Sequence, residues 1–238
     1  MEYKEFFEYL SKYSEKIEVD ITEKESKYLF NYMKLLLEWN NRINLTAITN
    51  EKEIILKHFI DSLTANKYIK NNKTIMDIGT GAGFPGIPLK ILNEEINFIL
   101  VDSLNKRINF LQEVKNRLEI NKLDLIHSRV EDLAHNVNYR EKSDIVISRA
   151  VANLRVLVEY MLPLVRKKGY CICMKGPKID EELKDSKKAI EILGGKIEKI
   201  DKITLPQNLD RNILIIKKVE STPSKYPRKA GIPAKQPL

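Results

Sequence analysis

Apolar residues recur at helical spacing through the first 70 residues of the chain. Thr22-Glu-Lys-Glu25 has the form of a capping box, in which two side chains satisfy backbone amides at a helix start. The apolar positions after it lie three or four residues apart: Leu29, Tyr32, Met33, Leu36 and Trp39. A second start, Asn50-Glu-Lys-Glu53, leads into Ile54-Ile-Leu56, Phe59-Ile60 and Leu63. Residues 1–70 are therefore predicted to form a small N-terminal helical cap.

From about residue 73, short apolar runs alternate with helical segments, a pattern typical of βαβ units around a parallel sheet. Seven strands are predicted, near residues 75–78, 97–101, 123–127, 144–148, 169–174, 196–203 and 212–217. Only Pro206-Gln-Asn-Leu-Asp-Arg211 separates the last two, which leaves no room for a crossover helix, so this pair should be antiparallel. Residues 71–219 are thus predicted to be an α/β domain whose Rossmann-like sheet has six parallel strands and one antiparallel strand.

A glycine-rich turn follows the first predicted strand. Gly79, Gly81, Gly83 and Gly86 are four of the chain's nine glycines and fall within eight residues. Glycine permits positive φ and lets a flat ligand approach the backbone, because no Cβ stands in the way. The turn therefore predicts a nucleotide-type site, although Gly81-Ala-Gly83-Phe-Pro-Gly86 also fits the dinucleotide fingerprint GxGxxG.

Two carboxylates favour a cationic ligand over a pyrophosphate. Asp77 lies two residues before the first glycine of the turn, where it would repel a pyrophosphate on the following helix N-terminus. S-adenosylmethionine (SAM) suits this position, since it carries a sulfonium and an α-ammonium but no phosphate. Asp102 should end the second strand and accept hydrogen bonds from both ribose hydroxyls. With its one reversed strand, the predicted sheet is the SAM-methyltransferase form of the doubly wound fold.

The charge balance indicates a polyanionic partner. The chain has 41 Lys and Arg against 33 Asp and Glu, a formal net charge of +8, which favours nucleic acid.

Cys171 and Cys173 share one face of an apolar run and are interpreted as core residues in a reducing cytosol. No metal-ligand spacing, signal-peptide pattern or run of 18 apolar residues occurs, so a cytoplasmic protein without a metal site is expected.

The last residues, 220–238, hold four of the nine prolines and a basic excess. Such a segment is predicted to have no fixed structure of its own. It is interpreted either as an extended arm that approaches phosphates or as a solvated tail without a role.

Further candidate residues follow the third, fourth and fifth predicted strands, because ligands lie at the carboxyl ends of strands in such sheets. Val130 and Glu131 can offer backbone or carboxylate contacts to an adenine, although an ordinary turn capped by Asp132 fits the same residues. The cations near the other strand ends are candidates for positioning a methyl acceptor, since Arg can bind guanine or phosphate. Each alone could equally be a solvated surface charge; the four are Arg129, Arg149, Lys175 and Arg211.

Two absent motifs narrow the choice of acceptor. Methylation of the adenine or cytosine amino group usually uses an Asn/Asp-Pro-Pro-aromatic tip after the fourth strand, and the sequence has none. Carbon-5 methylation of a pyrimidine needs a loop cysteine as nucleophile, whereas both cysteines lie inside a predicted strand. Guanine N7 bears no proton and has a free lone pair, so positioning alone can suffice there.

Several segments together resemble one family, the bacterial small-subunit ribosomal RNA guanine-N7 methyltransferases, also called the glucose-inhibited division protein B or methyltransferase G family. The resemblance covers nearly the whole chain except the tail. Its segments are Trp39-Asn-Asn-Arg-Ile-Asn-Leu-Thr-Ala-Ile48, His58-Phe-Ile-Asp-Ser-Leu63, Asp77-Ile-Gly-Thr-Gly-Ala-Gly-Phe-Pro-Gly86, Ser128-Arg-Val-Glu131 and Ser148-Arg-Ala150.

The resemblance implies a function and a set of site residues. It implies methyl transfer from SAM to guanine 527 in the decoding-region loop of 16S rRNA, by a monomer acting within a small-subunit ribonucleoprotein particle. Contacts to SAM are implied for Gly79, Phe84, Val130, Glu131 and Arg149, and roles in RNA binding or catalysis for Arg129, Lys175 and Arg211. Two rival functions stay open: a nicotinamide-dependent oxidoreductase, because of GxGxxG, and a non-catalytic SAM-binding assembly factor for rRNA.

Overall fold

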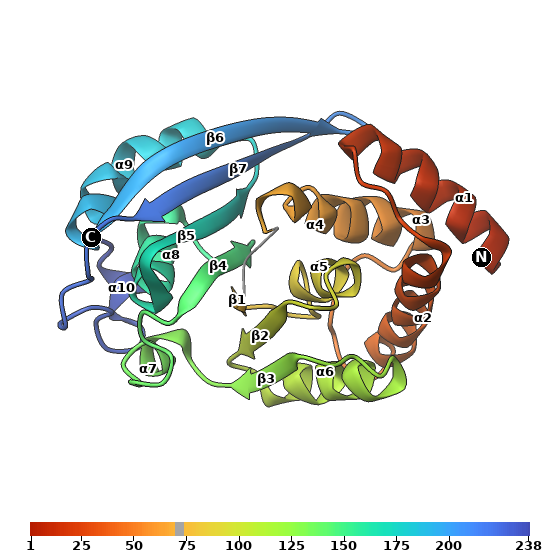
Figure 1. The fold of residues 1–238 in the computed structure, drawn as a ribbon, viewed down its shortest axis with the longest axis horizontal. Helices are drawn as coiled ribbons and strands as arrows, with labels where there is room; N and C mark the ends of the chain where they lie inside the picture. Colours follow the sequence, from red (N-terminus) through yellow and green to blue (C-terminus); the bar gives the residue numbers. More distant parts are fainter. Residues whose placement is uncertain (70–73) are drawn as a thin grey trace.

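The computed structural model describes residues 1–69 and 74–238, and a seven-stranded sheet crosses it in the order β3-β2-β1-β4-β5-β7-β6 (Figure 1). The strands are β1 (Thr74–Ile78), β2 (Asn97–Asp102), β3 (Leu123–His127), β4 (Ser143–Arg149), β5 (Val165–Lys175), β6 (Gly195–Leu205) and β7 (Leu209–Lys218). Adjacent strands in the part of the sheet ordered β3-β2-β1-β4-β5 are all parallel. Strand β7 is antiparallel to both of its neighbours, β5 and β6. The predicted sheet, with six strands in one direction and one reversed, is confirmed.

The strands β5 and β6 are longer than predicted. Each has 11 residues, and the extra residues at the start of β5 include the exposed Arg166, Lys167 and Lys168. Apolar periodicity detects only the part of a strand that packs on a core. The polar start of β5 was therefore missed.

The N-terminal residues, predicted to form a cap, are helical. Its elements are α1 (Tyr3–Ser14), η1 (Glu15–Ile17), α2 (Glu23–Asn40), α3 (Glu51–Ile54), the π-helical η2 (Ile55–Ile60), α4 (Asp61–Leu63) and η3 (Asn66–Tyr68). Thr22 and Glu25 make the predicted capping box of α2, and the Asn50 side chain caps α3. The predicted boundary between cap and sheet domain, at residues 70 and 71, lies outside the described residues.

Helices cover both faces of the sheet. The remaining ones are α5 (Gly86–Leu92), α6 (Asn105–Arg117), α7 (Val130–Leu133), α8 (Leu154–Met161), η4 (Leu162–Leu164), α9 (Ile179–Ile192) and α10 (Ile232–Lys235). The cap, α5 and α6 lie on one side, and α7 to α10 on the other (Figure 1).

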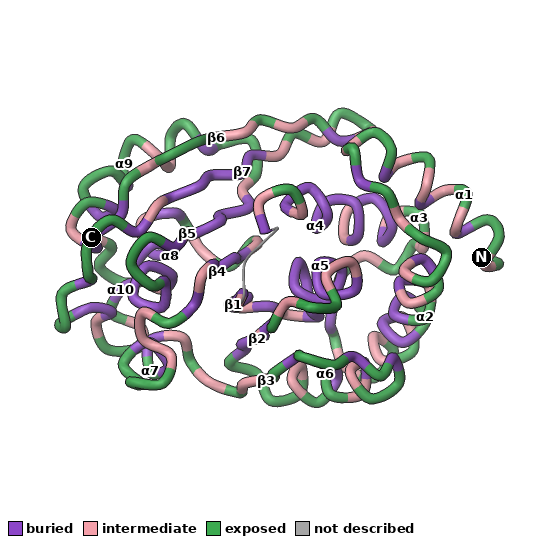
Figure 2. Tube along the Cα trace, viewed as in Figure 1, coloured by how far each residue is buried: buried purple, intermediate pink, exposed green. Residues whose placement is uncertain are grey.

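Two hydrophobic clusters, one on each face, make the core. The first joins cap residues such as Phe6 and Phe59 to Ile145 and Ile172 of the sheet, so the cap shares its core with the strands. The second contains Cys171 and Cys173, which confirms both cysteines as core residues. Burial is concentrated in the central strands and in α5 (Figure 2). The site at the strand ends is thus built on the rigid centre of the molecule.

The prediction that residues 220–238 lack fixed structure is wrong. Thr222, Tyr226, Pro227 and Pro233 are buried, and the segment ends in the short helix α10. The segment is held by hydrogen bonds to residues distant in sequence, and Tyr226 packs into the second hydrophobic cluster. It has no apolar periodic face, which explains why the sequence pattern gave no sign of order. Separately, no helix in the described residues is long and apolar enough to cross a membrane.

Candidate functional site

Two pockets lie at the carboxyl ends of the strands, on either side of the tip of β4. The β1–β3 pocket has a volume of about 230 Å³. Its lining residues are Ile78, Gly79, Val101, Asp102, Ser103, Ser128, Arg129, Val130, Glu131, Val151 and Tyr160. The β4–β7 pocket has a volume of about 400 Å³. Its lining residues are Ile48, Lys57, His58, Asp61, Arg149, Ala150, Met174, Lys175, Gly176, Glu182 and Arg211.

Consecutive residues of one loop separate the two pockets. Ala150 lines the β4–β7 pocket and Val151 lines the β1–β3 pocket. The strand order reverses between β1 and β4, and such a switch point is where doubly wound sheets bind ligands. The two pockets therefore flank the position where a group could pass from one ligand to another.

A third pocket, of about 410 Å³, lies at the opposite ends of the strands beside Lys90, Glu94 and Lys122. The Lys90 ammonium donates to the carbonyls of Asn93, Glu94 and Ile96, at 3.4, 2.6 and 2.7 Å. These bonds use all three donors of the side chain. Although this pocket is slightly the largest of the three, its buried cation is committed to the protein itself.

The glycines of the turn have different surroundings. Gly81, with φ of 62°, has no atom within 4 Å of where a Cβ would be, so it borders open space. Gly79 faces Val151, whose Cγ2 would lie 2.5 Å from a Cβ. At Gly83 a Cβ would lie 2.6 Å from Ile87 and 2.8 Å from the Tyr32 hydroxyl. Gly81 thus leaves room for a ligand, whereas close packing requires glycine at positions 79 and 83.

Asp77 lies beneath this turn and is completely buried. Its Oδ2 accepts hydrogen bonds from the Thr80 hydroxyl at 2.7 Å and the Gly86 amide at 2.9 Å. Its Oδ1 has no hydrogen-bond partner among the described residues. Burial raises the pKa of Asp77 to about 7, against the lowering effect of these two bonds and of Arg149. The carboxyl group holds the turn in shape and keeps one oxygen unused.

Asp102 joins the turn to the second strand. Its Oδ2 accepts the Gly81 amide at 2.9 Å and pairs with Arg107 at 3.2 Å, while Oδ1 accepts the Leu104 amide at 2.9 Å. A carboxylate offers about four acceptor positions, so one is left for a ligand. The predicted placement of Asp102 at the end of the second strand, in a pocket, agrees with the structure.

Residues after β3 form the far wall of the β1–β3 pocket. Arg129 is exposed at the start of α7, Val130 opens the helix, and Glu131 is buried. Glu131 Oε1 accepts the Gly231 amide at 3.1 Å, a contact from the C-terminal segment. All three predicted residues therefore line the pocket that also contains Asp102.

Arg149 ties the tip of β4 to the cap. Its Nη1 donates to the Lys57 carbonyl at 3.2 Å and pairs with Asp61 Oδ2 at 3.0 Å, and Nη2 lies 3.2 Å from His58 Nδ1. The guanidinium lies over the Phe84 ring, 5.2 Å from its centroid. Phe84 is therefore packed under Arg149 and beside His58, and its predicted contact with SAM stays a prediction.

The other predicted cations of the β4–β7 pocket are also paired. Arg211 Nε lies 3.1 Å from Asp61 Oδ1, so one carboxylate holds two arginines. Lys175 pairs with Glu182 at 2.7 Å and donates to the Ala152 carbonyl at 2.8 Å. The structure thus brings Arg149, Lys175 and Arg211 to one pocket, while Arg129 lines the other.

Four polar residues of this pocket were missed as site residues: Lys57, His58, Asp61 and Glu182. His58 stacks on Phe84 with ring centroids 4.4 Å apart. Burial, and then the Arg149 charge, lower the pKa of His58 to about 3, so the ring is neutral near pH 7. The spacing of His58 and Asp61, three apart on a helix, could have indicated a shared face.

Most of the chain matches one known protein family. The family model described as rRNA small subunit methyltransferase G matches residues 25–214. The chain belongs to this family. Curated ribosomal RNA small subunit methyltransferases G are closely similar: one from Desulforamulus reducens is 53% identical over 96% of this chain and 97% of its own, and one from Alkaliphilus oremlandii is 50% identical over 93% and 94%.

Solved structures share the fold at much lower identity. Magnesium protoporphyrin IX methyltransferase from Synechocystis PCC 6803, solved with bound SAM, has a TM-score of 0.58 and 15% identity, covering 79% of this chain and 97% of its own. P. horikoshii TYW2, solved with MeSAdo, has a TM-score of 0.54 and 12% identity, covering 67% and 62%. The predicted SAM-methyltransferase fold is thus confirmed.

Buried thiols distinguish this methyltransferase G family member from enzymes that use a cysteine nucleophile. Burial raises the pKa of Cys173 to about 12 and that of Cys171 well above its usual value. Both side chains lie inside β5 and are fully buried. Neither can supply a thiolate to a base in the β4–β7 pocket.

Proposed function

We propose that this methyltransferase transfers the methyl group of SAM to N7 of a guanine in 16S rRNA, namely guanine 527 of the decoding-region loop. The observation that carries the proposal is the pairing of Arg149 and Arg211 on one Asp61 carboxylate, in a pocket whose Arg149 packs on Phe84 of the glycine turn. A guanine offers O6 as an acceptor to arginine, and a contact there leaves the N7 lone pair free to react. The same pocket offers no thiol, as carbon-5 methylation would need.

The residues of the β1–β3 pocket fit SAM. Open space at Gly81 admits a flat ligand against the backbone, and Asp102 keeps an acceptor position for a ribose hydroxyl. The unpartnered Oδ1 of Asp77, beneath the turn, can accept a hydrogen bond from an ammonium group. Gly79, Val130 and Glu131 would complete the wall of this pocket, and we keep Gly83, Phe84 and Arg149 as candidate cofactor contacts. When bound, SAM supplies an electrophilic methyl group.

On the acceptor side, the chain has to position a base and need not remove a proton. N7 of guanine carries a lone pair and no hydrogen, so the reaction requires no general base. The neutral His58 ring and the paired arginines form a fixed frame around the pocket. We propose Arg149, Lys175 and Arg211 as the residues that hold the base and its phosphates, and Arg129 as a further RNA contact.

We also propose the particle, the oligomeric state and the compartment in which the enzyme acts. The substrate is 16S rRNA within a small-subunit particle, the enzyme is a monomer, and it acts in the cytoplasm, where ribosomal subunits assemble. Residues 1–70 serve as a cap, residues 71–219 as the methyltransferase domain, and residues 220–238 as an addition to that domain.

A transfer assay separates this function from its rivals. Purified protein is incubated with methyl-labelled SAM and small subunits from cells that lack the enzyme, and SAM and NAD binding are measured in parallel. Label in 7-methylguanine at one 16S position supports the proposal. Binding of SAM and rRNA without transfer would favour an assembly factor, and binding of NAD in place of SAM an oxidoreductase.

A further inference from the structure

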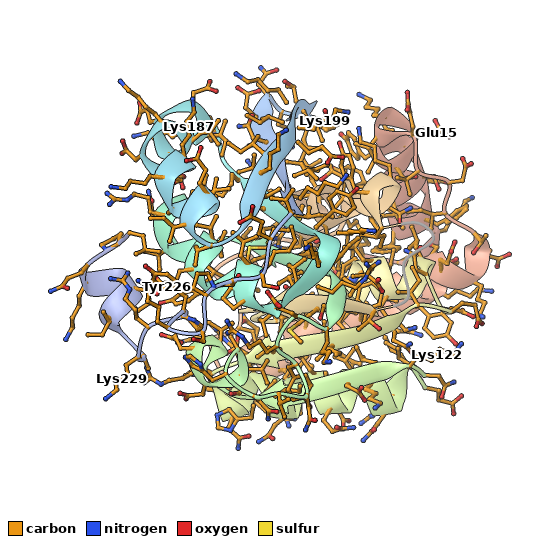
Figure 3. All side chains as sticks on the ribbon, turned by 60° about the vertical axis from the view of Figure 1, so that its left-hand side comes forward. Glu15, Lys122, Lys187, Lys199, Tyr226 and Lys229 are labelled. Carbon is orange, nitrogen blue, oxygen red and sulfur yellow. The ribbon has the colours of Figure 1, made fainter. Side chains whose placement is uncertain are left out.

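The C-terminal segment, residues 221–238, is hydrogen-bonded to α8 and to the loop between α7 and β4. The Arg140 guanidinium donates to the carbonyls of Tyr226 at 2.8 Å and Thr222 at 2.9 Å. Arg155 donates to the carbonyls of Leu238 at 2.6 Å and Pro237 at 3.0 Å. Figure 3 shows Tyr226 between this segment and the body of the protein, with Lys229 projecting away from it. Two arginines of the main domain thus hold both ends of the segment.

A buried ion pair fixes the middle of the segment. Glu159 of α8 has no exposed surface, and its Oε1 accepts the backbone amide of Arg228 at 2.8 Å and Nε at 3.0 Å. Its Oε2 accepts Nη2 of the same residue at 2.7 Å. Removing Arg228 would leave a carboxylate buried without its partner, which is costly. The segment is therefore part of the folded domain.

From this anchor the chain reaches the wall of the pocket. Three residues after Arg228, the amide of Gly231 donates to Glu131 Oε1 at 3.1 Å. Gly231 has φ of 82°, a conformation that favours glycine, and a side chain there would meet open space. Tyr160, which also lines the pocket, has its pKa raised to about 12 by burial and then by the charge of Glu131. Glu131 is thus set between the C-terminal segment and Tyr160.

We propose that the C-terminal segment belongs to the cofactor site, with Gly231 and Arg228 as positioning residues that fix Glu131 for the nucleoside part of the cofactor. This inference rests on the proposed function. It assigns a role to a segment beyond residue 214, where the family match ends. It also replaces the interpretation of this segment as an extended arm, because the segment is folded against the domain and Arg228 is committed to Glu159. RNA binding by its exposed lysines, Lys225, Lys229 and Lys235, stays a prediction.

The test is a double-mutant cycle on SAM affinity in the full-length protein. Gly231→Ala and Glu131→Gln are made singly and together, and Arg228→Gln supplies an independent disruption of the anchor. Lys229→Gln is the matched control, since it removes the same charge from an exposed neighbour. Dissociation constants come from titration calorimetry and melting temperatures from the same samples.

Alanine at 231 keeps the backbone amide but disfavours the positive φ, and Arg228→Gln releases the anchor, so both should move this amide away from Glu131. We expect each variant to bind SAM roughly tenfold more weakly, the effect of a lost hydrogen bond to a charged group. Lys229→Gln should bind as the wild type does, and Gly231→Ala should have little further effect once Glu131 is Gln. Lower melting temperatures with wild-type SAM affinity would overturn the inference and leave the proposed function standing. A wild-type protein that binds no SAM would instead overturn the proposed function, and the inference with it.

Discussion

Asp61 and Arg211 are 150 positions apart in the sequence, yet Arg211 Nε lies 3.1 Å from Asp61 Oδ1. The other oxygen of the same carboxylate pairs with Arg149 at 3.0 Å. The cap thereby fixes two guanidiniums from β4 and β7 in one pocket. A guanidinium group recognises a ligand only when its N–H donors are correctly oriented. Asp61 therefore determines the direction in which Arg149 and Arg211 can donate hydrogen bonds.

Asp61→Asn should lower methyl transfer while leaving SAM binding intact. The asparagine side chain carries no charge, so both arginines lose their ion pair and their guanidinium groups become less well ordered. The value of kcat/KM should therefore fall by roughly ten- to a hundredfold. The dissociation constant for SAM should stay within about twofold. Glu38→Gln, which breaks an exposed pair with Arg42, is the control and should have wild-type activity. Undiminished transfer by Asp61→Asn would remove Asp61 from the acceptor site.

Lys175→Gln should also reduce transfer, by about a hundredfold if Lys175 contacts the acceptor. The loss leaves Glu182 without its ammonium partner and frees the Ala152 carbonyl at the loop between the two pockets. Lys178→Gln makes the same charge change at an exposed position three residues further on. The measurement is single-turnover transfer to rRNA, and equal rates for the two variants would argue against a role for Lys175.

Gly81→Val should lose SAM binding, whereas Gly83→Val should lose stability. At Gly81 the added side chain meets open space, so the variant should fold with only a backbone penalty of about 1–2 kcal/mol but lose SAM binding. At Gly83 it would collide with Ile87 and Tyr32, so this variant should be much less stable. Urea unfolding and SAM titration distinguish the cases. Wild-type SAM affinity in folded Gly81→Val would contradict the assignment of the turn.

Asp77 and His58 should have opposite effects on stability as pH changes. Because the pKa of Asp77 rises from 3.8 to about 7 on folding, the native state keeps a proton that the unfolded state loses, and this contribution to stability falls as pH rises between those values. The pKa of His58 drops from 6.5 to about 3 on folding, so its contribution rises with pH over that range. Between pH 4 and 6.5 the two therefore oppose each other.

Asp77→Asn should expose the His58 contribution. Asparagine can keep both accepted hydrogen bonds, since they share Oδ2, but it does not titrate. Its free energy of unfolding should rise with pH more steeply than that of the wild type, by up to about 1.4 kcal/mol per pH unit between pH 4 and 6.5. Urea unfolding at several pH values measures the difference. Parallel curves for the two proteins would show that Asp77 does not carry the raised pKa.

The sequence predicts the parts of this molecule whose signal is local. Strand cores follow from apolar runs, and the capping box at Thr22 from four adjacent residues. The predicted cations reach the pocket because strand ends are fixed by the topology. The Asp61 pairing and the need for glycine at position 83 depend on residues that are distant in sequence, such as Arg211 and Tyr32, and no local pattern encodes them.

The C-terminal segment shows a second limit. Its order comes from the hydrogen bonds that Arg140 and Arg155 donate to its backbone carbonyls, and from the ion pair of Arg228 with the buried Glu159. Proline-rich, basic composition is the same whether or not such partners exist elsewhere in the chain. Composition therefore indicated disorder where long-range hydrogen bonds impose structure.

The most direct test of the central claim is to map 7-methylguanine in 16S rRNA from cells without this protein, with the wild type restored, and with Asp61→Asn restored. Cleavage chemistry specific for 7-methylguanine, followed by primer extension, locates the modified base. We expect one modified guanine in the decoding-region loop that is absent without the protein, present with the wild type and strongly reduced with Asp61→Asn. An identical modification pattern with and without the protein would contradict the proposed function.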